Sequence, residues 1–145
     1  MLSRCFSPLR NFMTGTVVNR YSGVKRFTET KRFCNMEHRI ERYENGARKR
    51  EQYFKFGLSH HDKKPASTYW YPNGQKAFEV YFKNGLEHRI NKPAITHWSQ
   101  EGKTLYEMWY TNGIWHKKNG SRITESARSK ANEVFRDAMK IIRID

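Results

Sequence analysis

Residues 57–85 read GLSHHDKKPASTYWYPNGQKAFEVYFKNG, and residues 85–113 read GLEHRINKPAITHWSQEGKTLYEMWYTNG. The two stretches share one pattern at an interval of 28 residues, from one closing glycine to the next. The shared positions are a histidine, a Pro-Ala pair, a central glycine, a glutamate and an aromatic pair: His60 and His88, Pro65-Ala66 and Pro93-Ala94, Gly74 and Gly102, Glu79 and Glu107, and Tyr81-Phe82 and Trp109-Tyr110. Self-similarity at a fixed period of this size is typical of repeat proteins, in which each unit buries apolar surface against the next.

Glycines mark the expected turns, and they fall alternately 11 and 17 residues apart: Gly46, Gly57, Gly74, Gly85, Gly102 and Gly113. Four of them follow asparagine. Asn-Gly is the preferred dipeptide of type I′ hairpin turns, because both turn residues need a positive φ. Each complete longer interval contains a Pro-Ala pair. Proline cannot donate to a strand ladder, so this segment should lie at a sheet edge or cross between hairpins.

Alternating apolar and polar residues predict strands between these turns. In residues 104–111, Tyr106, Met108 and Tyr110 share one face and alternate with residues such as Glu107. Period-two alternation with aromatic residues favours a strand over a helix. We therefore predict a mainly β protein, in which residues 36–122 form a stack of antiparallel β-hairpin repeats.

The two ends of the chain differ from this pattern. Residues 1–35 are basic, contain Glu29 as their single acidic residue and show no sustained period, which predicts an irregular N-terminal extension. Residues 1–28 lack acids and are rich in serine and threonine, as transit peptides are, so mitochondrial import is an alternative to a basic tail. After Ile123 the apolar residues recur at three- and four-residue steps, which predicts an amphipathic helix over residues 123–145. That helix either caps the last hairpin or docks a partner.

Charge and composition restrict the class of partner. The net charge is +14, and a chain this basic favours nucleic acid, an acidic membrane surface or an acidic protein, unless the charge only solvates the surface. Cys5 and Cys34 are the only cysteines and lie outside the repeats, which indicates a reduced, intracellular protein. No apolar run approaches the roughly 20 residues that span a bilayer.

Histidine and glutamate are the recurring residues with potential chemistry. His60, His88 and His116 should form a ladder whose rungs are too far apart to share a metal ion, since metal–nitrogen bonds are about 2.0–2.1 Å. We expect each to hydrogen-bond a turn carbonyl or a repeated glutamate. The glutamates have no second positioned group for acid–base catalysis, so we predict no catalytic residue, no metal and no cofactor.

Cations beside aromatic rings form a further pattern. This mixture suits stacking on bases and pairing with phosphates, but it equally suits cross-strand packing rimmed by lysines. The candidate interaction residues are Arg48, Lys49, Arg50, Trp70, Trp98, Trp115, Lys117 and Lys118.

One stretch of the sequence resembles the MORN-like repeats abundant in large DNA viruses. It consists of residues 84–94 and of positions that follow them, namely Trp98, Gly102, Glu107, Trp109-Tyr110 and Asn112-Gly113. The resemblance covers about residues 37–120. The chain departs from it at Lys64 and Lys92, where glycine is usual before Pro-Ala. The resemblance implies a hairpin stack used for scaffolding or binding in virus particles or infected cells, although a fold does not by itself fix a function.

These observations predict a non-catalytic structural or adaptor protein of a large DNA virus, in the virion or in the cytoplasm of the infected cell. Its expected partners are proteins of an assembly. Two alternatives stay open, namely a nucleic-acid-binding basic protein and a mitochondrial accessory subunit.

Overall fold

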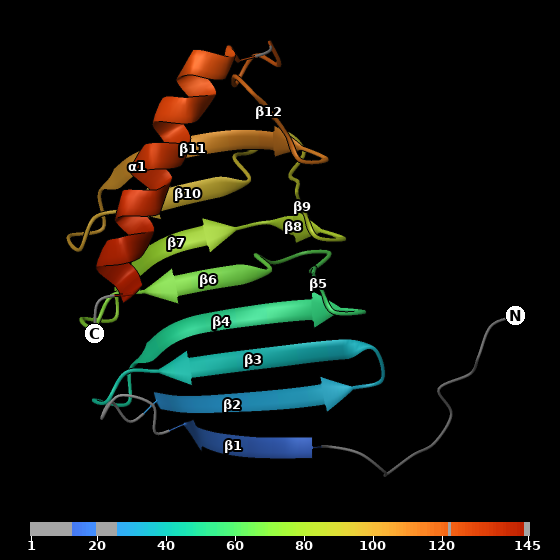
Figure 1. Ribbon diagram of the computed structural model, residues 1–145, viewed down its shortest axis with the longest axis vertical. Coiled ribbons are helices and arrows are strands. Elements are labelled where there is room, and N and C mark those ends of the chain that lie inside the picture. Colours follow the sequence, from blue (N-terminus) through green and yellow to red (C-terminus); the bar gives the residue numbers. More distant parts are fainter. Residues whose placement is uncertain (1–12, 20–25, 122, 144–145) are drawn as a thin grey trace, which may run out of the picture.

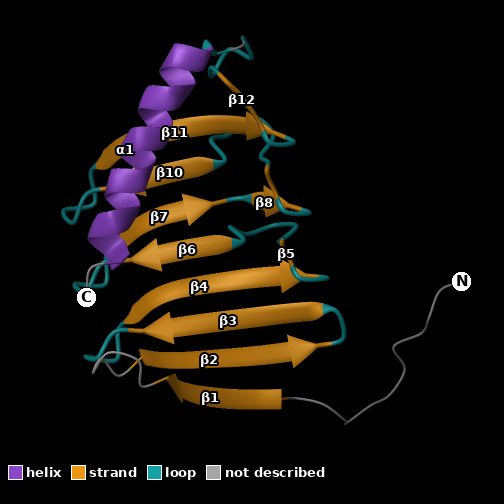
Figure 2. Cartoon of the chain, viewed as in Figure 1, coloured by secondary structure: helices purple, strands orange, loops and turns teal. Residues whose placement is uncertain are grey.

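The computed structural model describes residues 13–19, 26–121 and 123–143. Their elements are β1 (Met13–Asn19), β2 (Arg26–Phe33), β3 (Met36–Arg42), β4 (Arg48–Lys55), β5 (Leu58–Ser59), β6 (Ser67–Trp70), β7 (Lys76–Val80), β8 (Phe82–Lys83), β9 (Leu86–Glu87), β10 (Ile95–Trp98), β11 (Thr104–Thr111), β12 (Ile114–His116) and α1 (Glu125–Arg143). The main antiparallel sheet has the order β1-β2-β3-β4-β6-β7-β10-β11-β12, and β5 pairs with β4. Strands β8 and β9 form a small separate ladder. The prediction of a mainly β, antiparallel protein with a C-terminal helix is therefore confirmed (Figures 1 and 2).

Within the repeats the turns belong to two classes, one at each end of the strands, and the earlier turn between β2 and β3 differs from both because only Cys34 has a positive φ there. We call the row of strand ends on one side of the sheet the hairpin edge. Its repeat turns each have two consecutive residues of positive φ, as a type I′ turn requires: Phe56-Gly57, Asn84-Gly85 and Asn112-Gly113. At the opposite edge only the glycine has a positive φ. The Gly46 N–H donates to the Tyr43 carbonyl and the Tyr43 N–H donates to the Ala47 carbonyl, both at 2.9 Å, which closes a three-residue loop.

The expectation of a type I′ turn is thus wrong for Asn45-Gly46 and Asn73-Gly74. In both loops the asparagine side chain accepts a backbone N–H two residues on, at 2.9 Å for Asn45 and 3.0 Å for Asn73. The same side chains donate to carbonyls of the next unit, those of Pro72 and Gln100. These bonds favour the longer loop, which asparagine also suits.

Successive units are joined along the hairpin edge by what we call the histidine link. His60 Nδ1 accepts the N–H of Asn84 at 3.0 Å, and one repeat later His88 Nδ1 accepts the N–H of Asn112 at 3.1 Å. The acceptor nitrogen must be unprotonated, so the partner of these two histidines is the N–H of a turn, and not the turn carbonyl or glutamate expected from the sequence. His116 Nδ1 lies 2.8 Å from the Lys117 carbonyl of the following turn, as expected, and its Nε2 contacts Thr111 Oγ1.

A second set of links joins the units near the opposite edge. The Tyr43 hydroxyl donates to the Trp70 carbonyl at 2.7 Å, and the Tyr71 hydroxyl donates to the Trp98 carbonyl at 2.9 Å. Beside these links the register shifts by one residue, between Glu41 and Arg42, between Tyr69 and Trp70, and between His97 and Trp98. The register shift therefore recurs at the interval of the sequence repeat. The Pro-Ala segments connect β5 to β6 and β9 to β10, as expected of segments that cross between hairpins.

The expectation of an irregular extension over residues 1–35 is wrong for its described part. Strands β1 and β2 continue the sheet, with Glu29 paired to Ile40 of β3 and to Thr16 of β1. Strands pair through their backbone N–H and C=O groups. β1 and β2 can therefore join the sheet although their sequences do not alternate between apolar and polar residues. Residues 1–12 and 20–25, which carry part of the transit-peptide pattern, lie outside the described residues.

The core lies on one face of the sheet, which we call the helix face. Its rows across the strands include Tyr69-Phe78-His97-Tyr106 and Ser67-Val80-Ile95-Met108. Ala131 of α1 packs against the cluster that contains Val80, Ile95 and Met108. Figure 1 shows α1 crossing this part of the sheet, so the helix covers several strands rather than only the last hairpin. Thr124, just before the helix, accepts the Arg128 N–H at its carbonyl, 3.0 Å away.

Replacing Gly85 by valine should destabilise the protein far more than replacing Lys83 by valine. Gly85 has a φ of +81°, which a β-branched residue resists at a cost of about 1–3 kcal/mol. Lys83 is an exposed strand residue, where a change usually costs less than about 0.5 kcal/mol. Thermal unfolding of the two variants measures the difference, and equal midpoints would contradict the turn assignment.

Stability should also depend on pH through His97. This buried ring stacks on Phe78 with centroids 4.1 Å apart, and burial lowers the pKa of the imidazole below its ordinary value of 6.5. Because the unfolded chain then binds the proton more tightly, the contribution of His97 is complete above about pH 6.5 and is lost as the pH falls through the folded-state pKa.

His97→Phe keeps an aromatic ring beside Phe78 but cannot titrate. Urea unfolding at about pH 7.5 and about pH 5 should show a smaller acid-induced loss of stability for this variant than for the native chain. The native chain and the variant share all other titratable groups, so the difference between their acid-induced losses of stability isolates the contribution of His97. The same loss in both proteins would rule out the role given to His97.

Candidate functional site

An exposed apolar row runs along the hairpin edge, and we call it the apolar ridge. It consists of the first residue after each hairpin turn: Met36, Leu58, Leu86 and Ile114, which are 38%, 50%, 49% and 64% exposed. Leu58 Cδ2 lies 3.4 Å from the position that a Cβ on Gly85 would occupy, and Leu86 Cδ2 lies 3.3 Å from the equivalent position on Gly113. Each leucine therefore rests on the turn glycine of the next unit, and the ridge is continuous from unit to unit.

The ridge carries a basic margin. In the strand ladders Lys55 is paired with Leu58, and Lys83 is paired with Leu86. Paired residues of an antiparallel ladder point to the same side, so a cation stands beside each of these leucines. The sequence contains this signal, an apolar residue directly after a turn glycine at the repeat interval, but the alternation of residues along a strand does not show it.

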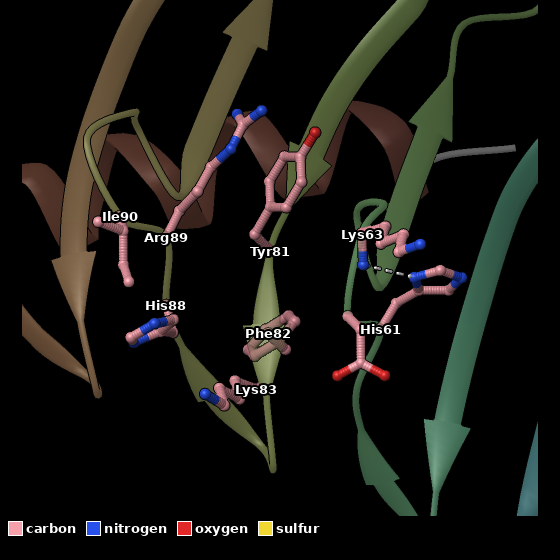
Figure 3. Close-up of a pocket in the computed structure, with 9 residues that line it drawn as sticks. His61, Lys63, Tyr81, Phe82, Lys83, His88, Arg89 and Ile90 are labelled. Atoms are coloured by element: carbon pink, nitrogen blue, oxygen red, sulfur yellow. Dashed lines mark hydrogen bonds between the residues drawn. The ribbon is translucent and has the colours of Figure 1, made fainter.

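A pocket of ≈ 310 Å³ lies next to the ridge, at the junction of the two complete units. It is lined by His61, Asp62, Lys63, Tyr81, Phe82, Lys83, His88, Arg89 and Ile90. Figure 3 shows Tyr81, Phe82 and Lys83 in the middle, with His61 and Lys63 on one side and His88, Arg89 and Ile90 on the other. The two arms of the β8–β9 hairpin and the loop after β5 thus form its floor and two walls.

Two basic side chains of the pocket are held by the fold. The Arg89 guanidinium lies 3.7 Å from the centroid of the Tyr81 ring and donates to the Pro93 carbonyl at 3.2 Å. His61 Nδ1 accepts the backbone N–H groups of Lys63 and Lys64 at 3.1 and 3.0 Å. Burial lowers the pKa of His61, and the nearby charge of Lys64 lowers it further. Because Nδ1 accepts both N–H groups, this nitrogen of His61 is unprotonated, and the ring orders its own loop.

A basic residue beside an aromatic ring recurs in these units. His61 meets the Tyr53 ring edge-on at 4.8 Å, and Arg89 covers Tyr81. The equivalent positions one repeat later are Trp109 and Lys117. Cations over aromatic faces stabilise folded proteins and also occur where proteins bind anions and bases.

The predicted cluster Arg48-Lys49-Arg50 is divided between internal contacts. Arg48 lies 5.9 Å from the Trp70 ring centroid and pairs with Glu51, whereas Arg50 pairs with Glu41 at 2.7 Å. Lys49 lies over the Tyr43 ring at 5.1 Å. These cations therefore do not gather into one patch.

The remaining predicted residues lie at separate places. Trp98 is half-buried at the end of β10, and Trp115 packs on Tyr110 of the core, with centroids 6.3 Å apart. Lys117 and Lys118 are exposed in the turn after β12. The structure thus does not place the predicted basic and aromatic residues in one site, and the pocket consists of other residues.

Two of the three repeated glutamates, Glu51 and Glu79, have charged partners, and Glu107 is exposed. Burial would raise the pKa of Glu51, but hydrogen bonds from His38 and Tyr53 hold that pKa below its ordinary range. Glu79 pairs with Lys76. Partly buried carboxylates need such partners. Glu51 and Glu79 therefore stabilise the sheet.

Within residues 13–19, 26–121 and 123–143, no group of three or more histidine, cysteine, aspartate or glutamate side chains is arranged to hold a metal ion. In the same part of the chain, no helix is long and apolar enough to cross a membrane. No protein-family model, curated protein or solved structure matches the chain. The assignment of a role therefore depends on the geometry of the ridge and the pocket.

Proposed function

We propose that the protein is a non-catalytic structural or adaptor protein that binds a protein partner along the apolar ridge. The observation that carries this proposal is the ridge itself, in which Leu58, Leu86 and Ile114 recur at the repeat interval and remain 49–64% exposed. Single exposed apolar residues are ordinary, but a contiguous row is characteristic of an interaction surface. The resemblance to MORN-like repeats supports a setting in the particle or the cytoplasm of cells infected by a large DNA virus.

The spacing of the ridge suits an amphipathic helix. Neighbouring units are two strands apart, and strands lie about 4.8 Å apart, so ridge residues recur about every 10 Å. A helix rises 1.5 Å per residue, so its own apolar residues at seven-residue intervals recur about every 10.5 Å. The partner helix should carry acidic residues beside its apolar row, because Lys55 and Lys83 flank the leucines.

The double variant Leu58→Asp/Leu86→Asp should lose this partner, whereas Leu105→Asp should keep it. Leu105 is 52% exposed and lies off the ridge, on β11, so it is a matched control for an exposed leucine. Burying one leucine contributes about 1.5–3 kcal/mol, so the double variant should bind at least about tenfold more weakly.

Affinity capture with the full-length chain from nuclease-treated extracts, followed by quantitative mass spectrometry, measures this loss. Both variants should first show native thermal midpoints. Partners retained equally by the double variant and by Leu105→Asp would contradict the ridge as the docking surface.

Nucleic-acid binding is the second candidate function. It is favoured by the net charge of +14 and by the Arg89–Tyr81 stack, in a pocket that exposed Lys63 and Lys83 also line. Phosphate contacts and base stacking use this combination of cations and rings.

Binding to single-stranded DNA or RNA should then weaken steeply with salt. Filter binding measures the slope of log affinity against log salt, which falls by about 0.7 for each phosphate contact removed in a single strand. Lys117→Ala/Lys118→Ala removes two exposed cations and leaves the described sheet intact, whereas deleting residues 1–35 would remove β1 and β2. If the native chain shows no salt-sensitive binding at low ionic strength, this function is excluded.

A further inference from the structure

We propose that the outer edge of β11, the side that faces away from β10, binds an extended segment of a protein partner, which joins the sheet as one more strand. An edge strand offers unpaired backbone N–H and C=O groups, and many proteins bind peptides by this kind of strand addition. The inference is independent of the adaptor function proposed above, because it uses backbone groups at the end of the stack and not the apolar ridge.

Each earlier unit fills the corresponding edge with its own chain. β6 covers the outer side of β4, where Thr68 is paired with Glu51. β10 covers the outer side of β7, where Thr96 is paired with Glu79. The next glutamate of this row is Glu107 on β11, which is paired with Thr96 on its inner side. On its outer side, no strand in the described part of the chain is paired with it.

The neighbouring elements leave this part of the edge open. Within the described residues β12 is paired with residues 109–111 alone, at one end of β11 (Figure 1). α1 lies over the helix face, where Ala131 packs on the core. Exposure agrees with this arrangement, since only 15% of the side chain is exposed in both Glu51 and Glu79, whereas Glu107 is exposed.

The backbone of Glu107 is oriented to accept a further strand. The Ala94 N–H donates to the Met108 carbonyl at 2.9 Å, so the backbone groups of Met108 face β10. Backbone groups of successive strand residues point to opposite sides, so those of Glu107 point outward. In the preceding unit the outward Tyr81 N–H donates to the Ala94 carbonyl, and Trp109 holds the equivalent place. An added strand therefore meets the N–H and C=O of Glu107 and the N–H of Trp109.

The strands that fill this position in the earlier units indicate the chemistry of the partner. They read Pro-Ala-Ser-Thr-Tyr-Trp over residues 65–70 and Pro-Ala-Ile-Thr-His-Trp over residues 93–98. In both, the threonine lies opposite the glutamate and an aromatic residue follows it. The equivalent residues 121–122 are serine and arginine, and α1 begins at residue 125. Because the open edge continues the same ladder, the partner segment should have the pattern Pro-Ala-x-Thr-aromatic.

Fluorescence anisotropy with a labelled synthetic peptide of residues 91–100 tests the proposal on the full native chain. The peptide should bind saturably, with a dissociation constant below about 1 mM. Methylation of the threonine N–H should weaken binding at least about tenfold, because this group donates to the Glu107 carbonyl. Methylation of the next N–H, that of the histidine, should change the affinity less than about threefold, because this group points away from β11.

Glu107→Pro is the matching variant of the chain. Proline removes the outward N–H, and the backbone groups of Tyr106 and Met108 that face β10 stay in place. This variant should bind the peptide at least about fivefold more weakly, whereas Glu107→Ala, which keeps the N–H, should bind like the native chain. Thermal midpoints establish that both variants fold. If Glu107→Pro does not fold, the two methylated peptides decide the question on the native chain.

Three results would overturn the proposal. The first is the absence of saturable binding by the native chain at about 1 mM peptide. The second is an equal loss of affinity for the two methylated peptides, since a peptide that replaced β10 would need both N–H groups. The third is equal binding by folded Glu107→Pro and Glu107→Ala. None of these results bears on the capture experiment with Leu58→Asp/Leu86→Asp, because the peptide assay leaves the apolar ridge unchanged.

Discussion

The hairpin stack depends on hydrogen bonds that unprotonated histidine nitrogens accept from the turn of the next unit. His60 Nδ1 accepts the N–H of Asn84, the first residue of the next hairpin turn, and His88 does the same for Asn112. The positive φ of these asparagines orients the turn amide toward the preceding unit, which the short Asn-Gly turn makes possible. Where the sheet is a single layer, such links hold each hairpin in register with its neighbour, and the tyrosine hydroxyl bonds near the opposite edge have the same effect.

Much of this fold was predictable because the repeat fixes both the interval between turns and the residues that need a positive φ. The two classes of turn were not predictable from the Asn-Gly dipeptide, since the choice depends on whether the asparagine side chain bonds a backbone N–H, as Asn45 does. Strands β1 and β2 were missed for a different reason. Their backbones pair with the edge of β3, and residues such as those in 26–33 have no apolar alternation to show it.

The candidate site was less predictable than the fold. Sequence proximity suggested that Arg48 and Arg50 act together, but each pairs with a different glutamate, Glu51 or Glu41. The pocket combines three segments, and only the stacking of units brings Lys63 beside Phe82.

The order of the strands makes the molecule extensible. β4 pairs with β6 and β7 pairs with β10, so each unit is joined to the following one by the same antiparallel ladder, and the register shift recurs with the same period. Duplication of one 28-residue segment of the gene would therefore insert a unit without disturbing α1 or the strands at the other end. Each copy would lengthen the sheet by about 10 Å and turn it by a constant angle. The number of copies would therefore set the length of the sheet, and that length could change during evolution only by whole units.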